Sequence, residues 1–538
     1  MPNLTLEEFE ELVFRQRIIA GDGATLAIPI GVRVLSDQLT PVLAYRRLVA
    51  ADHRRARSFL FESVEGGERQ GRYSIMGAQP TIELTSRAAE CEVSSRSGRS
   101  TRTVPDPLDE LRSIAAQYHF VRPAAAGPKD ALPSCVLGGW VGYAGYDSVR
   151  YVEPIKLPFA DAPKDDRGLA DLDFAFYDGV VAFDHVDKVV HVVQLALVGG
   201  GDDAARTYRD VLTRIEARIA TLETHSKPLR SGVLSSAAAK PHKPETSNLT
   251  RALHARMVES AKEYIRAGDI FQVVLGQRFE RSSSADPFDV YRALRAVNPS
   301  PYMVYMQCEG CILVASSPEI LCRVKKVAQG FEVTNRPLAG TRRRGTDAAE
   351  DADLERELLA DAKERAEHIM LVDLGRNDVG RVAQPGTVAT PALLQIERYS
   401  HVMHISSTVT GRLRSGMDCW DALRAALPVG TISGAPKVRA MQVIDELEPI
   451  RRGPYGGGMG YVGLDGQMDI ALTLRTMVVP TALARPEGQP TTWVYHLQAS
   501  GGIVADSEPE AEYQETVNKA AGLARAIDVA EQAFAPEP

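Results

Sequence analysis

Cysteine is scarce in this sequence, with six residues in a chain of 538. So few thiols cannot form the dense disulfide framework of a small secreted domain. Cys308 and Cys311 have CxxC spacing, but no second pair follows, so a hairpin turn is favoured over a zinc or redox site. The N-terminus is acidic and lacks the basic-then-apolar order of a secretion signal. We therefore expect a reduced, cytoplasmic protein.

Long apolar runs and long basic stretches are also missing. Runs such as 189–198 are too short to span a bilayer, so no membrane association is expected. The formal net charge is −8, and the basic cluster at 342–344 lies beside acidic runs, so nucleic-acid binding is not expected. A hydrophobic content of 44% is ordinary for a globular protein, and the length predicts two or more domains.

Composition divides the chain into three regions. Residues 1–225 mix short strand-like runs with a few helices, and 226–248 is a loop or linker rich in proline, serine and lysine. Residues 249–530 interleave strands and helices. Hairpins such as 455–479 favour an α+β (mixed α/β) architecture with antiparallel or mixed sheets over regular βαβ alternation.

Several helices are predicted in the third region. One spans about 250–267, a long one spans 348–374, and another begins near Ala435. The last begins at Ser507, where Ser507 and Glu510 have the spacing of a capping box.

Two of these helices carry pairs of carboxylates. Glu364 and Glu367 lie on one, and Glu367 shares a stripe with the apolar residues at i+3, i+4 and i+7. Glu512 and Glu515 lie on the other, on the same face as Lys519. A carboxylate facing a core is costly unless it is paired or bound to a cation. The two faces could hold a divalent metal between them; the alternative is ordinary solvated surface charge.

Two glycine-containing stretches imitate nucleotide-binding motifs. Residues 458–463 match GxGxxG, but 467–479 then alternates like a strand where the fingerprint needs a helix, so we reject a nicotinamide cofactor. Residues 430–437 lack P-loop spacing, although the helix start near Pro436 offers free N–H groups to an anion.

Further polar residues suit a small anionic ligand. Arg475, on a strand-like run, and Lys519 match carboxylates, while His404 and Glu319 can transfer protons. Mg²⁺ prefers carboxylate oxygens. Residue types and spacing lead this far, to a metal-dependent enzyme that acts on a small anion.

Five stretches resemble a known family. They are, in order, 269–275 (DIFQVVL), 298–303 (NPSPYM), 336–341 (RPLAGT), 367–378 (EHIMLVDLGRND) and 501–507 (GGIVADS). Together they closely resemble the chorismate-utilising enzymes, and within these the anthranilate synthase large subunits (component I, aminase). The resemblance covers nearly the whole chain. It implies large β-sheets packed centrally with helices outside, a regulatory N-terminal part and a chorismate-binding C-terminal part.

The resemblance implies roles for the carboxylates. Glu367 and Glu515 would ligate Mg²⁺, which bridges to the ring carboxylate of chorismate, with Glu364 and Glu512 supporting them from one turn away. The positions implied to hold the substrate are Gly340, Thr341, Thr431, Tyr455, Arg475, Ser500, Gly501, Gly502 and Lys519. The family usually has glycine where this chain has Ser500.

The resemblance also implies the chemistry. Ammonia adds at C2 of chorismate while the C4 hydroxyl leaves, protonated by Glu319, and His404 serves the elimination of pyruvate that gives anthranilate. Relatives that add water carry a lysine where this chain has Gln272, and relatives that aminate at C4 carry one where this chain has Ala339. Both residues favour amination at C2, the first committed step of tryptophan biosynthesis.

A regulatory site and a partner are implied as well. Ser63 is similar to part of a tryptophan feedback site, whose other wall would be Pro301, Tyr302 and Met303. No glutamine-amidotransferase segment is visible, so a separate glutamine amidotransferase small subunit would supply ammonia in a hetero-oligomer. Alternatives are a C4-aminating or water-adding relative, a catalytically inactive tryptophan-binding regulator and, least supported, a nicotinamide oxidoreductase.

Overall fold

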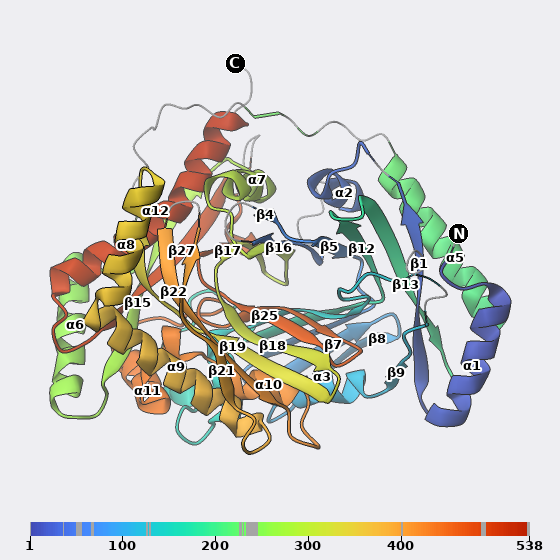
Figure 1. Ribbon diagram of the computed structural model, residues 1–538, viewed down its shortest axis with the longest axis horizontal. Helices are drawn as coiled ribbons and strands as arrows, with labels where there is room; N and C mark the ends of the chain where they lie inside the picture. The colour runs from blue at the N-terminus through green and yellow to red at the C-terminus, as the bar shows by residue number, and fades with distance from the viewer. Residues whose placement is uncertain are drawn as a thin grey trace.

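Two large β-sheets form the centre of the molecule, and helices cover the outside (Figure 1). The computed structural model describes residues 2–35, 37–49, 56–65, 69–124, 127, 131–224, 229, 231–232, 246–399, 402–485 and 491–534. Most of the predicted linker 226–248 lies outside these residues. The expected mixed α/β class with central sheets is confirmed.

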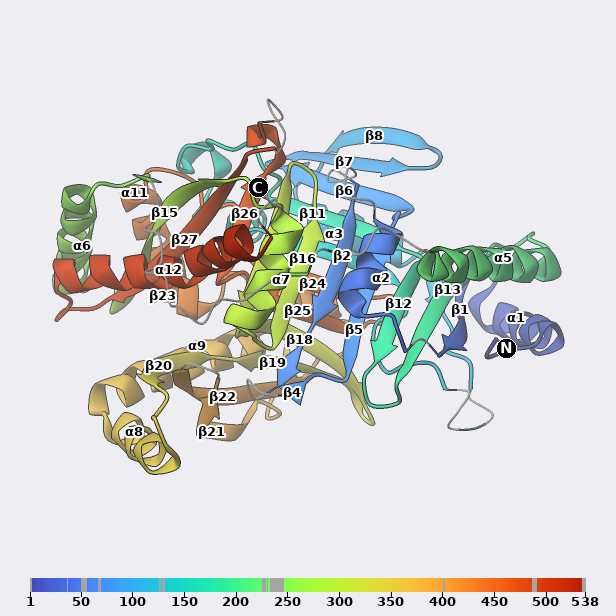
Figure 2. The same ribbon diagram turned by 90° about the horizontal axis from the view of Figure 1, so that it is seen from above.

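The first sheet has 13 strands. In spatial order they are β14 (Thr246–Ser247), β15 (Gln272–Ser283), β27 (Trp493–Ile503), β26 (Thr476–Pro480), β17 (Cys311–Ser317), β16 (Tyr302–Gln307), β2 (Ser58–Glu62), β5 (Tyr73–Ala78), β12 (Gly179–Asp184), β13 (Val189–Val198), β1 (Thr25–Val34) and β9 (Tyr118–Phe120), with β23 (Gly434–Ala435) beside β15. Figure 2 shows this arrangement from above.

The second sheet has 12 strands. Their order is β20 (Leu338–Arg343), β22 (Val402–Arg412), β19 (Gly330–Arg336), β18 (Ile320–Val327), β25 (Met468–Leu472), β24 (Gly458–Gly463), β10 (Gly139–Ala144), β11 (Leu172–Tyr177), β6 (Ile82–Arg87), β7 (Glu90–Ser95) and β8 (Gly98–Thr103), with β21 (Ala389–Arg398) beside β22. A separate hairpin joins β3 (Val64–Glu65) to β4 (Arg69–Gln70).

The described α-helices connect and flank these strands. They are α1 (Leu6–Ala20), α2 (Pro41–Leu48), α3 (Pro107–Ala115), α4 (Val149–Val152), α5 (Ala204–Glu223), α6 (Arg251–Arg266), α7 (Pro287–Val297), α8 (Ala348–Ala360), α9 (Ala362–Val382), α10 (Cys419–Ala426), α11 (Lys437–Leu447) and α12 (Pro509–Ala533). None of them combines the length and apolar character that crossing a membrane requires.

Both sheets contain strands from both halves of the chain. β2 pairs with β16 in one sheet, and β10 pairs with β24 in the other. Side chains from the two sheets meet in a shared core, where the rings of Phe59 and Tyr177 pack edge to face with centroids 4.9 Å apart. These strand pairings place parts of region 1–225 and of region 249–530 in each sheet. The division into a regulatory and a catalytic region stays a prediction.

Two sequence predictions about hairpins are confirmed. Residues 458–463 form β24, which pairs with β25 in a hairpin, so no helix follows the GxGxxG pattern. Cys308 and Cys311 flank the turn between β16 and β17, where the Cys308 N–H donates to the Cys311 carbonyl at 2.9 Å.

Two helix predictions are wrong in detail. The predicted helix 348–374 is divided at Asp361, whose side chain accepts from the N–H groups of Lys363 and Glu364 and so begins α9 as an N-cap. The predicted capping box at Ser507 is absent, because α12 begins at Pro509 and the Ser507 hydroxyl accepts from the Val504 N–H instead.

Close strand contact at Gly142 gives a stability prediction. A Cβ there would lie 2.0 Å from the backbone oxygen of Asp173, which cannot move without separating β10 from β11. We expect Gly142→Ala to lower the free energy of unfolding by about 2–3 kcal/mol in urea denaturation. The control is Gly522→Ala on α12, where the Cβ meets nothing within 4 Å. It should stabilise the protein by about 0.5–1 kcal/mol; equal effects of the two changes would contradict the packing argument.

Candidate active site

Three of the four carboxylates lie against neighbouring residues of β27, while Glu364 lies against Gly340 on β20, where a Cβ would be 3.1 Å from its Oε2. A Cβ at Gly501 would lie 3.0 Å from Glu512 Oε2 and 3.8 Å from Glu515 Oε1. A Cβ at Gly502 would lie 3.7 Å from Glu367 Oε1. Helices α9 and α12, far apart in sequence, therefore bring their acidic faces together over a strand that has no side chain in the way.

Polar neighbours already occupy two of the carboxylates. Gln272 Nε2, at the start of β15, donates to Glu367 Oε1 at 2.9 Å. Lys519 Nζ lies 2.6 Å from Glu515 Oε1, one helical turn along α12. The remaining amide oxygen of Gln272 is buried and has no hydrogen-bond partner. Next to the carboxylate oxygens of Glu367, this part of the site therefore contains an amide oxygen, from Gln272, that has no hydrogen-bond donor.

The other two carboxylates show the electrostatic cost of the cluster. Burial raises the pKa of Glu364, Arg342 opposes the rise through a hydrogen bond, and Glu367 adds to it. Burial likewise raises the pKa of Glu512, and Glu515 adds to the rise. Glu512 Oε2 is also buried without a hydrogen-bond partner. The contact of Arg342 with Glu364 was not predicted from the sequence, although Arg342 stands in the basic cluster at 342–344.

The arrangement of the four carboxylates shows whether they could bind a divalent cation. Within the described ranges, no three acidic, histidine or cysteine side chains lie close enough to ligate one ion. Glu364 and Glu512, one from each pair, have raised pKa values, and Glu512 Oε2 has no hydrogen-bond partner. Carboxylate oxygens are ligands that Mg²⁺ prefers, and the ion also takes oxygens from a bound substrate. The carboxylates therefore fit Mg²⁺ as part of its coordination shell, with substrate oxygens supplying further ligands.

Glu319 is a buried acid between β17 and β18, only 3% exposed. The Thr431 hydroxyl donates to its Oε1 at 3.0 Å. Burial raises the pKa of Glu319 to about 8, against the opposing hydrogen bond from Thr431 and the positive charge of Arg475. At neutral pH this carboxyl is therefore protonated and can act as a general acid.

His404 on β22 is a neutral imidazole with a defined tautomer. Its Nδ1 lies 3.0 Å from the carbonyl oxygen of Gly340 and 3.0 Å from Thr341 Oγ1. Because a carbonyl oxygen only accepts, the proton resides on Nδ1 and the lone pair on Nε2. Burial, followed by the positive charge of Arg475, lowers the pKa of His404 to about 4. The Nε2 atom is thus a base at neutral pH.

Arg475 joins these two groups. Its Nη2 lies 3.3 Å from His404 Nε2, and its charge acts on Glu319. The expectation that Arg475 lies on a strand is wrong: it occupies the bend between β25 and β26, where the chain passes from one sheet to the other. Its φ of +45° is rare for a residue with a side chain and persists only where surrounding structure fixes it.

Ser500 links two more of the predicted substrate contacts. Its hydroxyl lies 2.6 Å from the Tyr455 hydroxyl, and its carbonyl accepts from Lys519 Nζ at 2.9 Å. Burial raises the pKa of Tyr455 to about 12, so the phenol stays neutral. The Ser500 hydroxyl therefore fixes the tyrosine hydroxyl by a hydrogen bond.

The predicted regulatory residues also lie together, away from the carboxylates in sequence. β2 pairs with β16, so that Met303 faces Glu62 across the ladder, next to Ser63. Pro301 and Tyr302 precede Met303 at the same end of the sheet, and the Val64 N–H donates to Ser300 at 3.1 Å. Glu62, a buried acceptor for Tyr291 and Arg295, was missed by the sequence analysis. The tryptophan-binding role of this group stays a prediction.

Known proteins resemble this chain along most of its length. The family model described as chorismate binding enzyme matches residues 45–525. The chain belongs to this family. Anthranilate synthase alpha subunit 1, chloroplastic, is 52% identical in Oryza sativa subsp. japonica (96% of this chain and 90% of that protein) and 52% in Arabidopsis thaliana (95% and 87%). Within the family, this enzyme groups with the anthranilate synthase large subunits.

A solved structure agrees with this assignment. The crystal structure of anthranilate synthase component I from Streptococcus pneumoniae TIGR4 superposes with a TM-score of 0.70 at 32% identity, covering 92% of this chain and 99% of that one. The arrangement of two large central sheets is therefore the arrangement of the family.

The relatives correct one sequence prediction. Both plant proteins are named chloroplastic, which overturns the expectation of a cytoplasmic location. All six cysteines are free, and free thiols do not identify a compartment.

Infrared spectroscopy can check the state of Glu319 directly. We expect a protonated carboxyl band that disappears as the pH rises through about 8 and that is missing in Glu319→Gln. Thr431→Val removes the hydroxyl that favours the charged form, so the midpoint should move up by about one pH unit. A carboxyl already ionised at pH 6 would contradict this description of the site.

Proposed function

We propose that this protein aminates chorismate at C2 with ammonia, with Mg²⁺ bound, and then eliminates pyruvate to release anthranilate in tryptophan biosynthesis. The observation that carries the proposal is a neutral acid, Glu319, and a neutral base, His404, that share Arg475 as neighbour. Replacing a hydroxyl by an amine needs the acid, and aromatising the ring needs the base.

The first step uses the proton of Glu319. Ammonia forms a bond to C2, both ring double bonds shift, and the C4–O bond breaks as Glu319 donates its proton, so that the hydroxyl leaves as water. The ammonium formed at C2 then loses a proton to solvent. Thr431 holds the carboxyl by its hydrogen bond at 3.0 Å. After the step, Arg475 stabilises the carboxylate that remains.

The second step uses the lone pair of His404. The C2 proton passes to Nε2, the C3–O bond breaks and the ring becomes aromatic. The enolpyruvyl group leaves as an enolate, which takes up a proton to become pyruvate. The hydrogen bond from Nδ1 to the Gly340 carbonyl keeps the ring in the tautomer that this transfer needs. Burial, together with the charge of Arg475 beside Nε2, keeps the imidazole neutral between turnovers.

The substrate is a dianion, and the site supplies matching groups. Arg475 and Lys519 are cationic, while Tyr455 and Thr341 donate neutral hydrogen bonds. Backbone of Gly340, Ser500, Gly501 and Gly502 approaches without bulky side chains. Mg²⁺, held by Glu367 and Glu515 with Glu364 and Glu512 behind them, would neutralise the ring carboxylate when bound.

Gln272 supports amination over hydration. Its amide is neutral and already donates to Glu367 at 2.9 Å, so it cannot take a proton from water. Ammonia carries its own lone pair and needs no such base. Ala339, next to Gly340, likewise offers no lysine for attack at C4. The choice of C2 follows from these two uncharged side chains.

Two further parts of the proposal concern control and supply. Tryptophan would bind at Ser63, Pro301, Tyr302 and Met303 and favour one arrangement of the two regions. β2 pairs with β16, and β16 pairs with β17, which Glu319 follows. A displacement of β2 or β16 on tryptophan binding would therefore be transmitted to the segment that carries Glu319. A glutamine amidotransferase small subunit would supply ammonia in a hetero-oligomer, in keeping with relatives named as alpha subunits.

A product assay tests the proposed reaction. Purified protein with chorismate, Mg²⁺ and excess ammonium just above neutral pH should produce anthranilate fluorescence, and chelation by EDTA should abolish it. Glu367→Gln with Glu515→Gln should reduce the rate about 100-fold or more and remove Mg²⁺ binding in calorimetry. The matched control is Glu510→Gln, an exposed residue of α12 that pairs with Arg251. An isochorismate or 4-amino product would defeat the proposal.

The pH dependence tests the role of the acid. Glu319 donates a proton, so it works only below its raised pKa of about 8. At constant free ammonia, kcat/KM should therefore fall as the pH rises through about 8. Glu319→Gln should lower kcat about 100-fold or more and lose this limb. If kcat/KM of the Glu319→Gln variant still fell as the pH rose through about 8, the fall would belong to another titrating group.

A further inference from the structure

Arg452, in the segment between α11 and β24, is 1% exposed. Its Nε and Nη2 donate to Glu448 at 2.9 and 2.6 Å. Its Nη1 donates to the carbonyl of Ile432 at 2.7 Å, and Nη2 also donates to the carbonyl of Val274 at 2.6 Å. The ring of Tyr146 covers the guanidinium, 4.6 Å from centroid to Cζ. Every nitrogen of this buried cation is thus directed to a specific acceptor.

Both carbonyls belong to segments that carry site residues. Ile432 directly follows Thr431, whose hydroxyl donates to Glu319. Val274 lies two residues after Gln272 on β15. Backbone hydrogen bonds also join the segment 430–435 to the start of β15: the Val274 N–H donates to the Ser433 carbonyl at 2.9 Å and the Phe271 N–H to the Ala435 carbonyl at 2.7 Å. Arg452 adds a side-chain link between the same two stretches. One guanidinium therefore holds two separate parts of the site at a fixed separation.

Glu448 extends the same anchor. Its Oε1 also accepts from the N–H of Gly276 at 2.8 Å, on β15 beyond Val274. Glu448 is 5% exposed, so the pair is buried on both sides. A buried ion pair often gives little net stability, because desolvation offsets the attraction, and fixing a geometry is the better-attested use of such pairs.

We propose that Arg452 is a positioning residue for the proposed reaction: it fixes the Thr431 segment against β15 so that Thr431 faces Glu319 and Gln272 faces Glu367. The inference rests on the proposed function for the roles of those two pairs. A lysine cannot replace the arginine, because a single ammonium does not span two carbonyls and a carboxylate in one plane.

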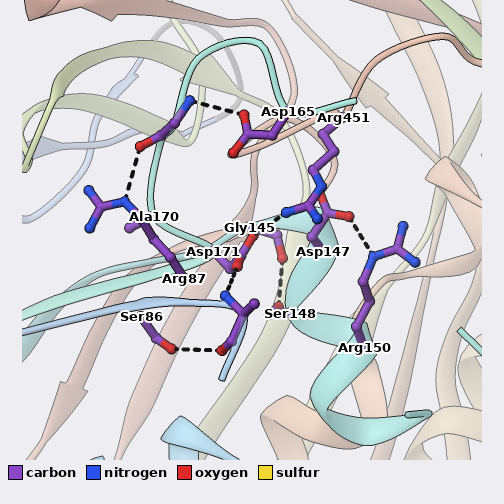
Figure 3. A network of polar contacts seen from close by, with 12 residues as sticks. Ser86, Arg87, Gly145, Asp147, Ser148, Arg150, Asp165, Ala170, Asp171 and Arg451 are labelled. Atoms are coloured by element: carbon purple, nitrogen blue, oxygen red, sulfur yellow. Dashed lines mark hydrogen bonds and ion pairs between the residues drawn. The ribbon is translucent and has the colours of Figure 1, made fainter. Parts of the chain in front are cut away.

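Arg150 provides a matched control. It is 2% exposed, donates to Asp147 through Nε at 2.7 Å, and binds Asp445 through both terminal nitrogens at 2.9 and 2.8 Å. Figure 3 shows Arg150 and Asp147 in a polar network that also contains Asp171 and Arg451. Arg150→Lys removes an equally buried fork but touches no carbonyl next to Thr431 or Gln272.

The first experiment needs no turnover and titrates the Glu319 carboxyl by infrared spectroscopy. Arg452→Lys should move the midpoint to higher pH in the same direction as Thr431→Val, by about one pH unit. The double variant should show the midpoint of Thr431→Val alone. Arg150→Lys should keep the wild-type midpoint. A merely structural role predicts lowered thermal stability for both arginine variants and no shift in either.

The second experiment measures anthranilate formation by the full chain. Arg452→Lys should lower kcat about 30- to 100-fold with KM changed less than about threefold, because bound substrate meets a displaced acid. Arg150→Lys should keep kcat within about twofold. If the wild-type protein makes no anthranilate, the proposed function is wrong, but the Glu319 titration still tests the positioning role of Arg452. An unshifted Glu319 midpoint in Arg452→Lys, or equal kcat losses in both variants, would overturn the inference.

Discussion

Two adjacent chain crossings between the sheets determine where the reactive groups lie. The chain leaves the 13-stranded sheet at the end of β17, passes Glu319 and enters β18 of the other sheet. It returns from β25 past Arg475 into β26. Because β17 pairs with β26 and β18 with β25, the crossings run side by side, and the Leu472 N–H donates to the Glu319 carbonyl at 3.0 Å. Acid and arginine are therefore neighbours as a consequence of topology.

Burial then sets the charge of each group. An isolated charge in a dry interior is costly, so Glu319 keeps its proton and His404 stays neutral. Arg452 and Glu448, which are also buried, form an ion pair with each other. One environment thus supplies a proton donor and a proton acceptor at the same pH, which a two-step replacement and elimination requires.

Local pattern predicted the parts of the fold that depend on nearby residues. Helical spacing identified the carboxylate faces of α9 and α12, and strand alternation excluded a dinucleotide fold at 458–463. The break at Asp361 was missed, because the residues on either side continue the helical pattern and only the N-cap geometry divides them. Location was also beyond such reasoning, since thiols respond to redox conditions that several compartments share.

The sequence by itself determined the residue types, most helices and hairpins, and the resemblance to chorismate-utilising enzymes, because these depend on short-range periodicity and on motifs in order. Tertiary structure alone decided that Arg475 lies at a crossing between sheets, that Glu319 is an acid near pH 8, and that Arg452 connects Ile432 to Val274. A pKa and a hydrogen-bond partner depend on which distant residues exclude water, and chain order does not specify that.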